Sequence, residues 1–236
     1  MCILSVLLIL NTLETKIEDG KYQSLNTAVL PRNHKDVQFY KTFCMNLEAV
    51  QRRIQQMTGG ALDRASILRR IKTNPPLIEG FIDLPSQLQI NGVDLTLHSI
   101  LGFSSLASKP SFLGKDDGQR KIAETFTIPE SGDGFWLLES GSYLVNFNEM
   151  VNIPLDLMAL GRARSSLLRS GVALHTAVWD SGYSGRSQAL LVVYHPNKII
   201  LERATRIMQL VFFTLENPVE KGYEGIYQNE GKVESP

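Results

Sequence analysis

The feature that most constrains the fold is a succession of short apolar segments that begins near Leu77. Each segment is rich in Val, Ile, Leu and aromatic residues, and Gly, Pro, Asn or Asp interrupts the chain at short intervals. Short strands with such breaks are typical of an antiparallel barrel or sandwich rather than of βαβ units. We predict strands at residues 93–97, 134–138, 142–147, 173–178, 188–194, 199–202 and 208–215.

Short helices are predicted ahead of these strands. Asp63 has the properties of an N-cap for a helix over residues 64–71, because its side chain can accept a hydrogen bond from a free backbone N–H. Pro75 and Pro76 follow this helix and prevent its continuation. A further short helix is predicted at residues 50–57, which precede a pair of glycines.

Composition restricts the class of protein. The chain has 236 residues, 43% of them hydrophobic and 20% charged, which fits one globular domain with extensions. Its 24 basic and 24 acidic residues argue against a general nucleic-acid-binding protein, which needs a basic excess. Cys2 and Cys44 are the only cysteines, so we expect reduced thiols in a cytoplasmic protein. Residues 1–10 are apolar but about half as long as a membrane span, so no membrane association is expected.

A first polar cluster consists of Arg162, Arg164, Ser165, Ser166 and Arg169. Guanidinium groups offer a planar set of donors that matches phosphate oxygens and keeps its charge. A serine is small enough to let backbone N–H groups approach the same anion. The cluster therefore indicates a polyanion site, although the same spacing also fits a solvent-exposed helix.

A second polar cluster follows the strand that ends near residue 179. Asp180 stands at the strand end, and Tyr183 lies between Gly182 and Gly185. Glycine permits positive φ angles and a close approach of a ligand to the backbone. A rigid strand with an anion site at one end and a carboxylate at the other can frame an active site. Taken alone, the second cluster equally fits a hairpin turn.

Together these motifs resemble the dUTPase/dCTP deaminase superfamily. There, an Arg-Ser-(Ser/Gly)-Leu motif binds phosphates and an Asp-x-x-Tyr-x-Gly motif shapes the nucleoside pocket. The matching residues here are 164–167 and 180–185, with further similar stretches at 91–97, 206–212 and 222–228. The resemblance implies a mainly β fold, a dUTPase-like antiparallel β-barrel of the β-clip or jelly-roll type with short helices near its N-terminal side.

The resemblance extends from about residue 61 to residue 231 and implies three parts. Residues 1–60 form an N-terminal extension to which no role is assigned, and residues 61–216 form the dUTPase-like barrel domain. Residues 217–236 are polar, lack a core pattern and are predicted to form a flexible C-terminal arm.

Two reactions follow from the resemblance, the hydrolysis of dUTP to dUMP and pyrophosphate and the deamination of dCTP. In the deaminases a glutamate acts as proton shuttle five residues after the last glycine of the Asp motif. This position is Leu190 here, and the nearby Gln188 cannot exchange a proton at neutral pH. The sequence therefore favours a dUTP diphosphatase. Two alternatives stay open. One is a dCTP deaminase or a bifunctional dCTP deaminase/dUTPase, and the other is a non-catalytic nucleotide-binding regulator.

The resemblance also implies roles for individual residues in hydrolysis. Asp180 matches the carboxylate that activates the attacking water, which is worth roughly 100- to 10,000-fold in rate. Mg²⁺ is the expected cofactor and would be held mainly by phosphate oxygens and waters, because it dehydrates reluctantly. Asp94 is a weaker candidate for contact with the metal or its waters, since its motif also fits a buried turn. The phosphates are expected to meet Arg164, Ser165, Ser166 and Arg169.

Three further residues are candidates for substrate binding. Tyr183 would stack on the deoxyribose and leave no room for a 2′-hydroxyl. His175 is a candidate for the base site, although a single histidine on an apolar strand also fits a structural role. Gln209 corresponds to a family glutamine near the phosphates, or it is a hydrogen-bonded amide of the core.

The C-terminal arm completes the implied site. Tyr223, Tyr227 and Gln228 match a family segment that closes over the triphosphate. The basic residue expected before the second tyrosine is Ile226 here, and Lys221 is the nearest replacement. Members of the superfamily are usually homotrimers with sites between subunits, so we expect a homotrimer whose active site combines groups from different chains.

Overall fold

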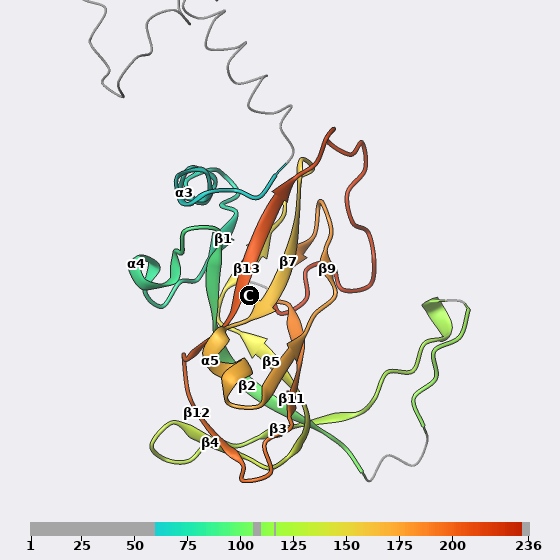
Figure 1. The fold of residues 1–236 in the computed structure, drawn as a ribbon. Coiled ribbons are helices and arrows are strands. Elements are labelled where there is room, and N and C mark those ends of the chain that lie inside the picture. The colour runs from blue at the N-terminus through green and yellow to red at the C-terminus, as the bar shows by residue number, and fades with distance from the viewer. Residues whose placement is uncertain (1–59, 106–109, 116, 233–236) are drawn as a thin grey trace, which may run out of the picture. The chain divides into compact units, whose positions relative to one another are not determined.

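The computed structural model describes residues 60–105, 110–115 and 117–232, all of which lie in one compact unit. This part of the chain is mainly β, and its strands pair in antiparallel fashion (Figure 1). The mainly β prediction is therefore confirmed. The helix predicted at residues 50–57 and part of the loop after β2 lie outside the described residues. In the described ranges, no helix has the length and apolar character needed to cross a membrane.

The helices are α3 (Arg64–Ile71), α4 (Leu84–Gln87), the 3₁₀ turn η1 (Asp117–Gln119) and α5 (Ser165–Arg169). The strands are β1 (Ile78–Glu79), β2 (Val93–Phe103), β3 (Thr125–Ile128), β4 (Phe135–Leu138), β5 (Gly141–Phe147), β6 (Met150–Asn152), β7 (Leu157–Ala163), β8 (Val172–His175), β9 (Val178–Trp179), β10 (Ser184–Gly185), β11 (Gln188–Val193), β12 (Ile199–Glu202) and β13 (Arg206–Thr214).

The main sheet has eight strands in the order β8-β11-β5-β2-β13-β7-β9, with β3 beside β2. β8 and β9 follow one another in sequence yet stand at opposite ends of this order. His175 of β8 pairs with Leu190, whereas Val178 of β9 pairs with Leu160. Residues 176–177 thus join the two ends, and the sheet curls towards a barrel. The single strand predicted at residues 173–178 is wrong, because this segment leaves one edge of the sheet and joins the other.

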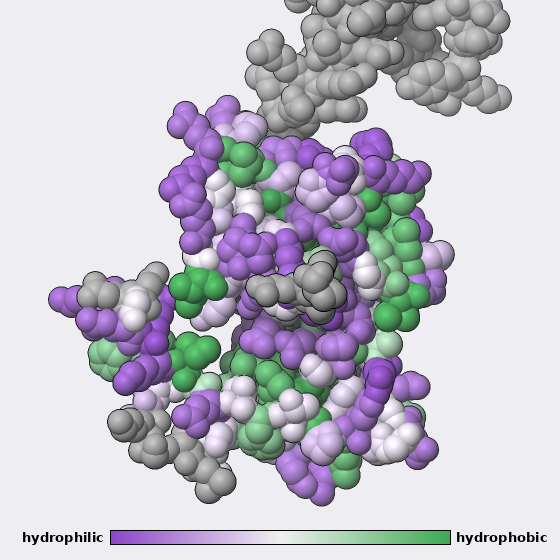
Figure 2. Space-filling model, turned by 180° about the vertical axis from the view of Figure 1, so that it is seen from behind, coloured by the Kyte–Doolittle hydropathy of each residue, from purple (hydrophilic) through white to green (hydrophobic). Residues whose placement is uncertain are grey.

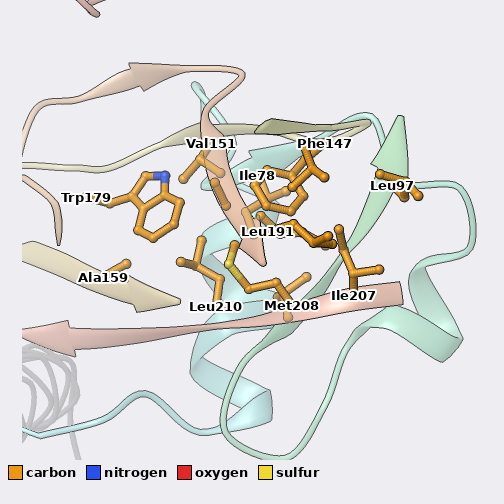
Figure 3. Packing of buried hydrophobic residues seen from close by; sticks show 14 of the residues in the cluster. Ile78, Leu97, Phe147, Val151, Ala159, Trp179, Leu191, Ile207, Met208 and Leu210 are labelled. Carbon is orange, nitrogen blue, oxygen red and sulfur yellow. The ribbon is translucent and has the colours of Figure 1, made fainter. Parts of the chain in front are cut away.

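Two smaller sheets complete the fold. One has the order β1-β6-β10, and the other pairs β12 with β4. The buried side chains form one cluster between the sheets, part of which is drawn in Figure 3. Phe147, Leu191 and Leu210 are among the members with no exposed surface. Figure 2 shows that hydrophobic residues also reach the surface among the polar ones.

The predicted N-cap of α3 is confirmed. The Asp63 Oδ1 atom accepts a hydrogen bond of 2.7 Å from the Ser66 backbone N–H, and α3 spans the predicted residues. The helix is attached to the strands by an ion pair between Arg70 and Asp156 and by a hydrogen bond from Arg64 to the Leu88 carbonyl oxygen.

After β13 the chain turns back along the sheet. The Val219 N–H donates to the Leu155 carbonyl at 3.0 Å, and the Tyr223 N–H donates to the Ser181 carbonyl at 2.8 Å. In Figure 1 this segment is the red trace that runs on the β9 side of the molecule. The residues up to 232 are therefore in contact with the barrel in this conformation. That the arm is flexible stays a prediction.

A buried polar network attaches α4 to β2 and β6. Glu149 has no exposed surface, and its carboxylate accepts hydrogen bonds from the Thr96 N–H at 2.8 Å, the Thr96 hydroxyl at 2.6 Å and the Gln87 amide at 2.7 Å. Burial raises the pKa of Glu149, and these donors oppose the rise. Gln87 also donates to the Asp94 carbonyl at 2.9 Å. Glu149 thereby holds the turn beside Asp94.

We expect Glu149→Gln to lower the free energy of unfolding by about 2 kcal/mol, because an amide cannot accept from donors on both of its terminal atoms. One donor would then be buried without a partner. Urea denaturation followed by circular dichroism measures the change. Glu220→Gln is the control, since Glu220 is exposed. Equal stability of the two variants would contradict the importance of this network.

Candidate functional site

The first part of the site lies where β7 passes into α5. Arg164 caps this short helix, and its backbone N–H donates to the Ile207 carbonyl at 3.1 Å. The Arg164 Nε atom lies 3.1 Å from Asp94 Oδ2, and the Arg206 Nη1 atom lies 3.5 Å from the same oxygen. Gln209 is the strand partner of Asp94. The structure therefore brings Arg164, Arg206, Asp94 and Gln209 together at one place.

The Asp94 carboxylate forms ion pairs with both arginines. It is 2% exposed, and burial raises its pKa although both guanidinium groups oppose the rise. A buried ion pair is weak evidence for stability, so the contribution of this arrangement that the geometry supports is to hold Arg164 and Arg206 beside Asp94. Among the described residues there is no group of three or more His, Cys, Asp or Glu that could hold a metal ion. The metal-related role of Asp94 stays a prediction.

The other phosphate-binding candidates lie on α5. Ser165 and Ser166 are exposed on the first turn, next to Arg164. Arg169 stands at the other end of the helix, about 7 Å further at 1.5 Å per residue. There it lines a cleft of about 470 Å³ with His195 and Lys198. The structure places the two serines beside Arg164 and separates Arg169 from it.

The second part of the site is the turn after β9. Asp180 is exposed, and its carbonyl oxygen accepts from the Tyr183 N–H at 3.1 Å. Gly182 has a φ of +84°, and a Cβ atom there would lie 2.6 Å from the Gly222 Cα atom of the arm. This close approach explains why glycine is needed at both positions, where the arm crosses the turn.

Tyr183 lies under the arm and is only 6% exposed. Its hydroxyl donates to Glu230 Oε1 at 2.8 Å, and its ring meets the edge of Tyr223 with centroids 5.8 Å apart. Burial, followed by the contact with Glu230, raises the pKa of the Tyr183 hydroxyl. Tyr223 thus joins Tyr183, whereas Tyr227 points to the surface and is 39% exposed. Stacking of Tyr183 on a sugar stays a prediction.

Gln228 bridges the arm and the turn. Its Oε1 atom accepts from the Ser184 N–H at 2.9 Å, and its Nε2 atom donates to the Gly182 carbonyl at 2.9 Å. The side-chain amide is therefore used within the chain. Lys221 forms an exposed ion pair of 2.6 Å with Glu224, which is another residue of the arm.

His175 and Leu190 lie opposite one another on neighbouring strands, β8 and β11. His175 is exposed and Leu190 is half-buried, with Leu144 of β5 on the other side. None of the three strands contains an Asp or a Glu residue. The position opposite His175 is therefore occupied by an apolar side chain, Leu190, and not by a carboxylate.

The two parts of the site are separated along β7. Trp179 pairs with Ala159, and Arg164 lies five residues further along the chain from Ala159. At roughly 3.3 Å per residue, this corresponds to about 17 Å. Because the pairing is antiparallel, Asp180 continues away from Arg164. A single chain therefore does not bring the acid and the arginine cluster together.

Sequence reasoning missed Arg206 and Glu230. Arg206 meets Asp94, 112 positions away in the chain, and Glu230 meets Tyr183, 47 positions away. Arg206 begins the motif stretch at residues 206–212, whereas Glu230 lies just beyond the stretch at residues 222–228. The motif stretches indicated the relevant regions of the chain. The individual contacts depend on strand pairing and on the path of the arm, which the motifs do not show.

The fold is similar to that of the dCTP deaminase of Agrobacterium tumefaciens. That crystal structure matches with a TM-score of 0.50 and 20% identity, over 67% of this chain and 49% of the other. A family model described as dCTP deaminase-like matches residues 61–215. The chain therefore belongs to the dCTP deaminase-like family, and the resemblance to the dUTPase/dCTP deaminase superfamily is confirmed.

Archaeal relatives by sequence carry a more specific name. A Methanosarcina mazei protein named probable deoxyuridine 5′-triphosphate nucleotidohydrolase is 46% identical over 171 residues, which are 72% of this chain and 98% of the relative. A protein of the same name from Archaeoglobus fulgidus is 39% identical over 163 residues, 69% of this chain and 93% of the relative.

Proposed function

We propose that this chain hydrolyses dUTP to dUMP and pyrophosphate. The observation that carries the proposal is the high identity to archaeal proteins named deoxyuridine 5′-triphosphate nucleotidohydrolase, with nearly complete coverage of the relatives. The lack of a carboxylate on β8, β11 and β5 supports hydrolysis over deamination, because removal of an amino group needs a proton shuttle beside the base. The two cysteines, which cannot form a disulfide framework, favour a cytoplasmic location.

In this proposal Asp180 orients the attacking water and accepts its proton. Its exposure directly after the buried Trp179 supports this role, since a base must be accessible and rigidly placed. Arg164, with Ser165 and Ser166, binds the phosphate chain, and Asp94 keeps Arg164 and Arg206 in position. Gln209, next to this cluster, is the remaining phosphate-side candidate.

The proposed cofactor is Mg²⁺. A site of several protein carboxylates does not fit the described residues, and Asp94 already faces two guanidinium groups. The ion would therefore be held by phosphate oxygens and waters, with Asp94 at most in contact through water. When bound, the ion neutralises charge on the triphosphate.

We also propose a homotrimer with sites between subunits. The separation of about 17 Å along β7, at roughly 3.3 Å per residue, supports a site in which one chain provides Asp180 and a neighbour provides Arg164. Large apolar side chains at the surface are available for such an interface, among them Ile82, Ile90, Leu137 and Ile200.

The function is tested by turnover of dUTP, dCTP, dTTP and UTP, compared side by side with Mg²⁺. We expect pyrophosphate from dUTP at a rate well above that from the other three, and no ammonia from dCTP. Release of ammonia from dCTP would instead support a deaminase. Tight binding of dUTP without turnover would support a regulator.

We expect Asp180→Asn to lower the turnover of dUTP by about 100- to 10,000-fold, because the amide cannot accept the proton of water. The variant should stay folded and bind dUTP. Steady-state kinetics and circular dichroism measure both properties. Asp133→Asn is the matched control, since Asp133 is exposed in the turn before β4. Near-normal turnover by Asp180→Asn would refute the role of Asp180.

A further inference from the structure

The arm is attached to the Asp180–Tyr183 turn mainly through its backbone and Gln228. Three hydrogen bonds connect the main chains of the arm and of residues 181–186. The Tyr223 N–H donates to the Ser181 carbonyl at 2.8 Å, the Asn229 N–H to the Ser184 carbonyl at 2.7 Å, and the Arg186 N–H to the Glu230 carbonyl at 2.8 Å. The Gln228 side chain adds the two contacts already described. None of these interactions uses the side chain of Glu230.

The Glu230 side chain holds the hydroxyl of Tyr183. The hydrogen bond is 2.8 Å long and joins a buried hydroxyl to a half-buried carboxylate, and a bond to a carboxylate is stronger than one between neutral groups. A Cβ atom at Gly185 would lie 2.8 Å from the Tyr183 hydroxyl and 3.0 Å from the Glu230 carbonyl, so only glycine leaves room for this contact. Tyr223 meets the ring from the side. The Tyr183 ring is thus held at its hydroxyl by Glu230 and packs against the Tyr223 ring in a T-shaped arrangement.

We propose that Glu230 is a positioning residue that fixes the Tyr183 ring and thereby sets the preference of the site for 2′-deoxyribonucleotides. The inference rests on the proposed function and deepens it. Because Tyr183 is 6% exposed, a ligand meets a small and immobile part of the ring. A sugar hydroxyl is rejected by sterics only when the opposing group cannot move aside. Without Glu230 the ring could rotate about its side-chain torsions and admit the 2′-hydroxyl.

The charge of the arm fits this role better than a role in phosphate binding. Glu230 is an acid, and a carboxylate close to a triphosphate would be repelled. Lys221 is paired with Glu224, and the Lys232 ammonium group donates to the Asn229 side-chain oxygen at 2.8 Å. The described part of the arm therefore holds the turn through neutral contacts and one acid directed at Tyr183.

The test compares dUTP with UTP in four variants, namely Glu230→Ala, Glu230→Gln, Tyr183→Phe and the double variant Glu230→Ala/Tyr183→Phe. Two ratios are measured, the kcat/KM ratio and the binding ratio of the non-hydrolysable α,β-imido analogues. We expect Glu230→Ala and Tyr183→Phe each to reduce both ratios by about tenfold, from the loss of one charge-assisted hydrogen bond. The double variant should lose no more than either single variant, because the same bond is removed.

Glu230→Gln should keep the preference, since its amide oxygen still accepts from the Tyr183 hydroxyl. Glu224→Ala is the matched control, an arm glutamate whose partner Lys221 is on the surface. A purely structural role of Glu230 would change thermal stability or proteolysis of the arm and leave both ratios as in the wild type. That result, or equal effects of Glu230→Ala and Glu224→Ala, would overturn the inference.

The two ratios separate this inference from the proposed function. Wild-type protein that binds the dUTP analogue selectively but does not turn over dUTP would refute the hydrolase proposal. Loss of the binding preference in Glu230→Ala would still support the role of Glu230. Wild-type protein that hydrolyses dUTP, together with variants of unchanged preference, would refute only the role of Glu230.

Discussion

One segment of the chain forms both end strands of the main sheet, and the rest of the structure depends on its path. Residues 172–179 form β8 beside β11 and then β9 beside β7, so the curled sheet is joined through the chain itself. This path places Asp180 at the start of β7, while Arg164 follows the end of the same strand. The length of β7 therefore sets the distance between Asp180 and the arginine cluster, and this distance is the reason for proposing a site that two chains share.

Each part of the site is supported by buried polar contacts rather than by the apolar core alone. On one side Glu149 holds Gln87, which in turn contacts the backbone of Asp94, and Asp94 faces Arg164 and Arg206. On the other side Gln228 and Glu230 of the arm hold the turn that carries Tyr183. Such partners restrict the side chains that would meet a ligand, which is how a rigid scaffold prepares a site before binding.

The sequence predicted the fold class, but not the distances between the candidate site residues. The β rhythm and the Asp63 cap depend on local patterns, and both agree with the structure. The segment at residues 173–178 has the composition of one strand, yet its two halves pair with strands that are far apart in the sequence. Periodicity cannot detect such a change of partner. The same limit applies to Glu230, whose contact with Tyr183 depends on the return path of the arm.

The most direct test of the account is a subunit-mixing experiment with Asp180→Asn and Arg164→Gln, each inactive alone. Sites between chains would combine the intact acid of one variant with the intact arginine of the other. Random mixing of equal amounts should then restore about a quarter of the wild-type turnover of dUTP, as expected for sites shared between two chains. A mixture that stays as inactive as its components, although the subunits exchange, would contradict an active site built from two chains.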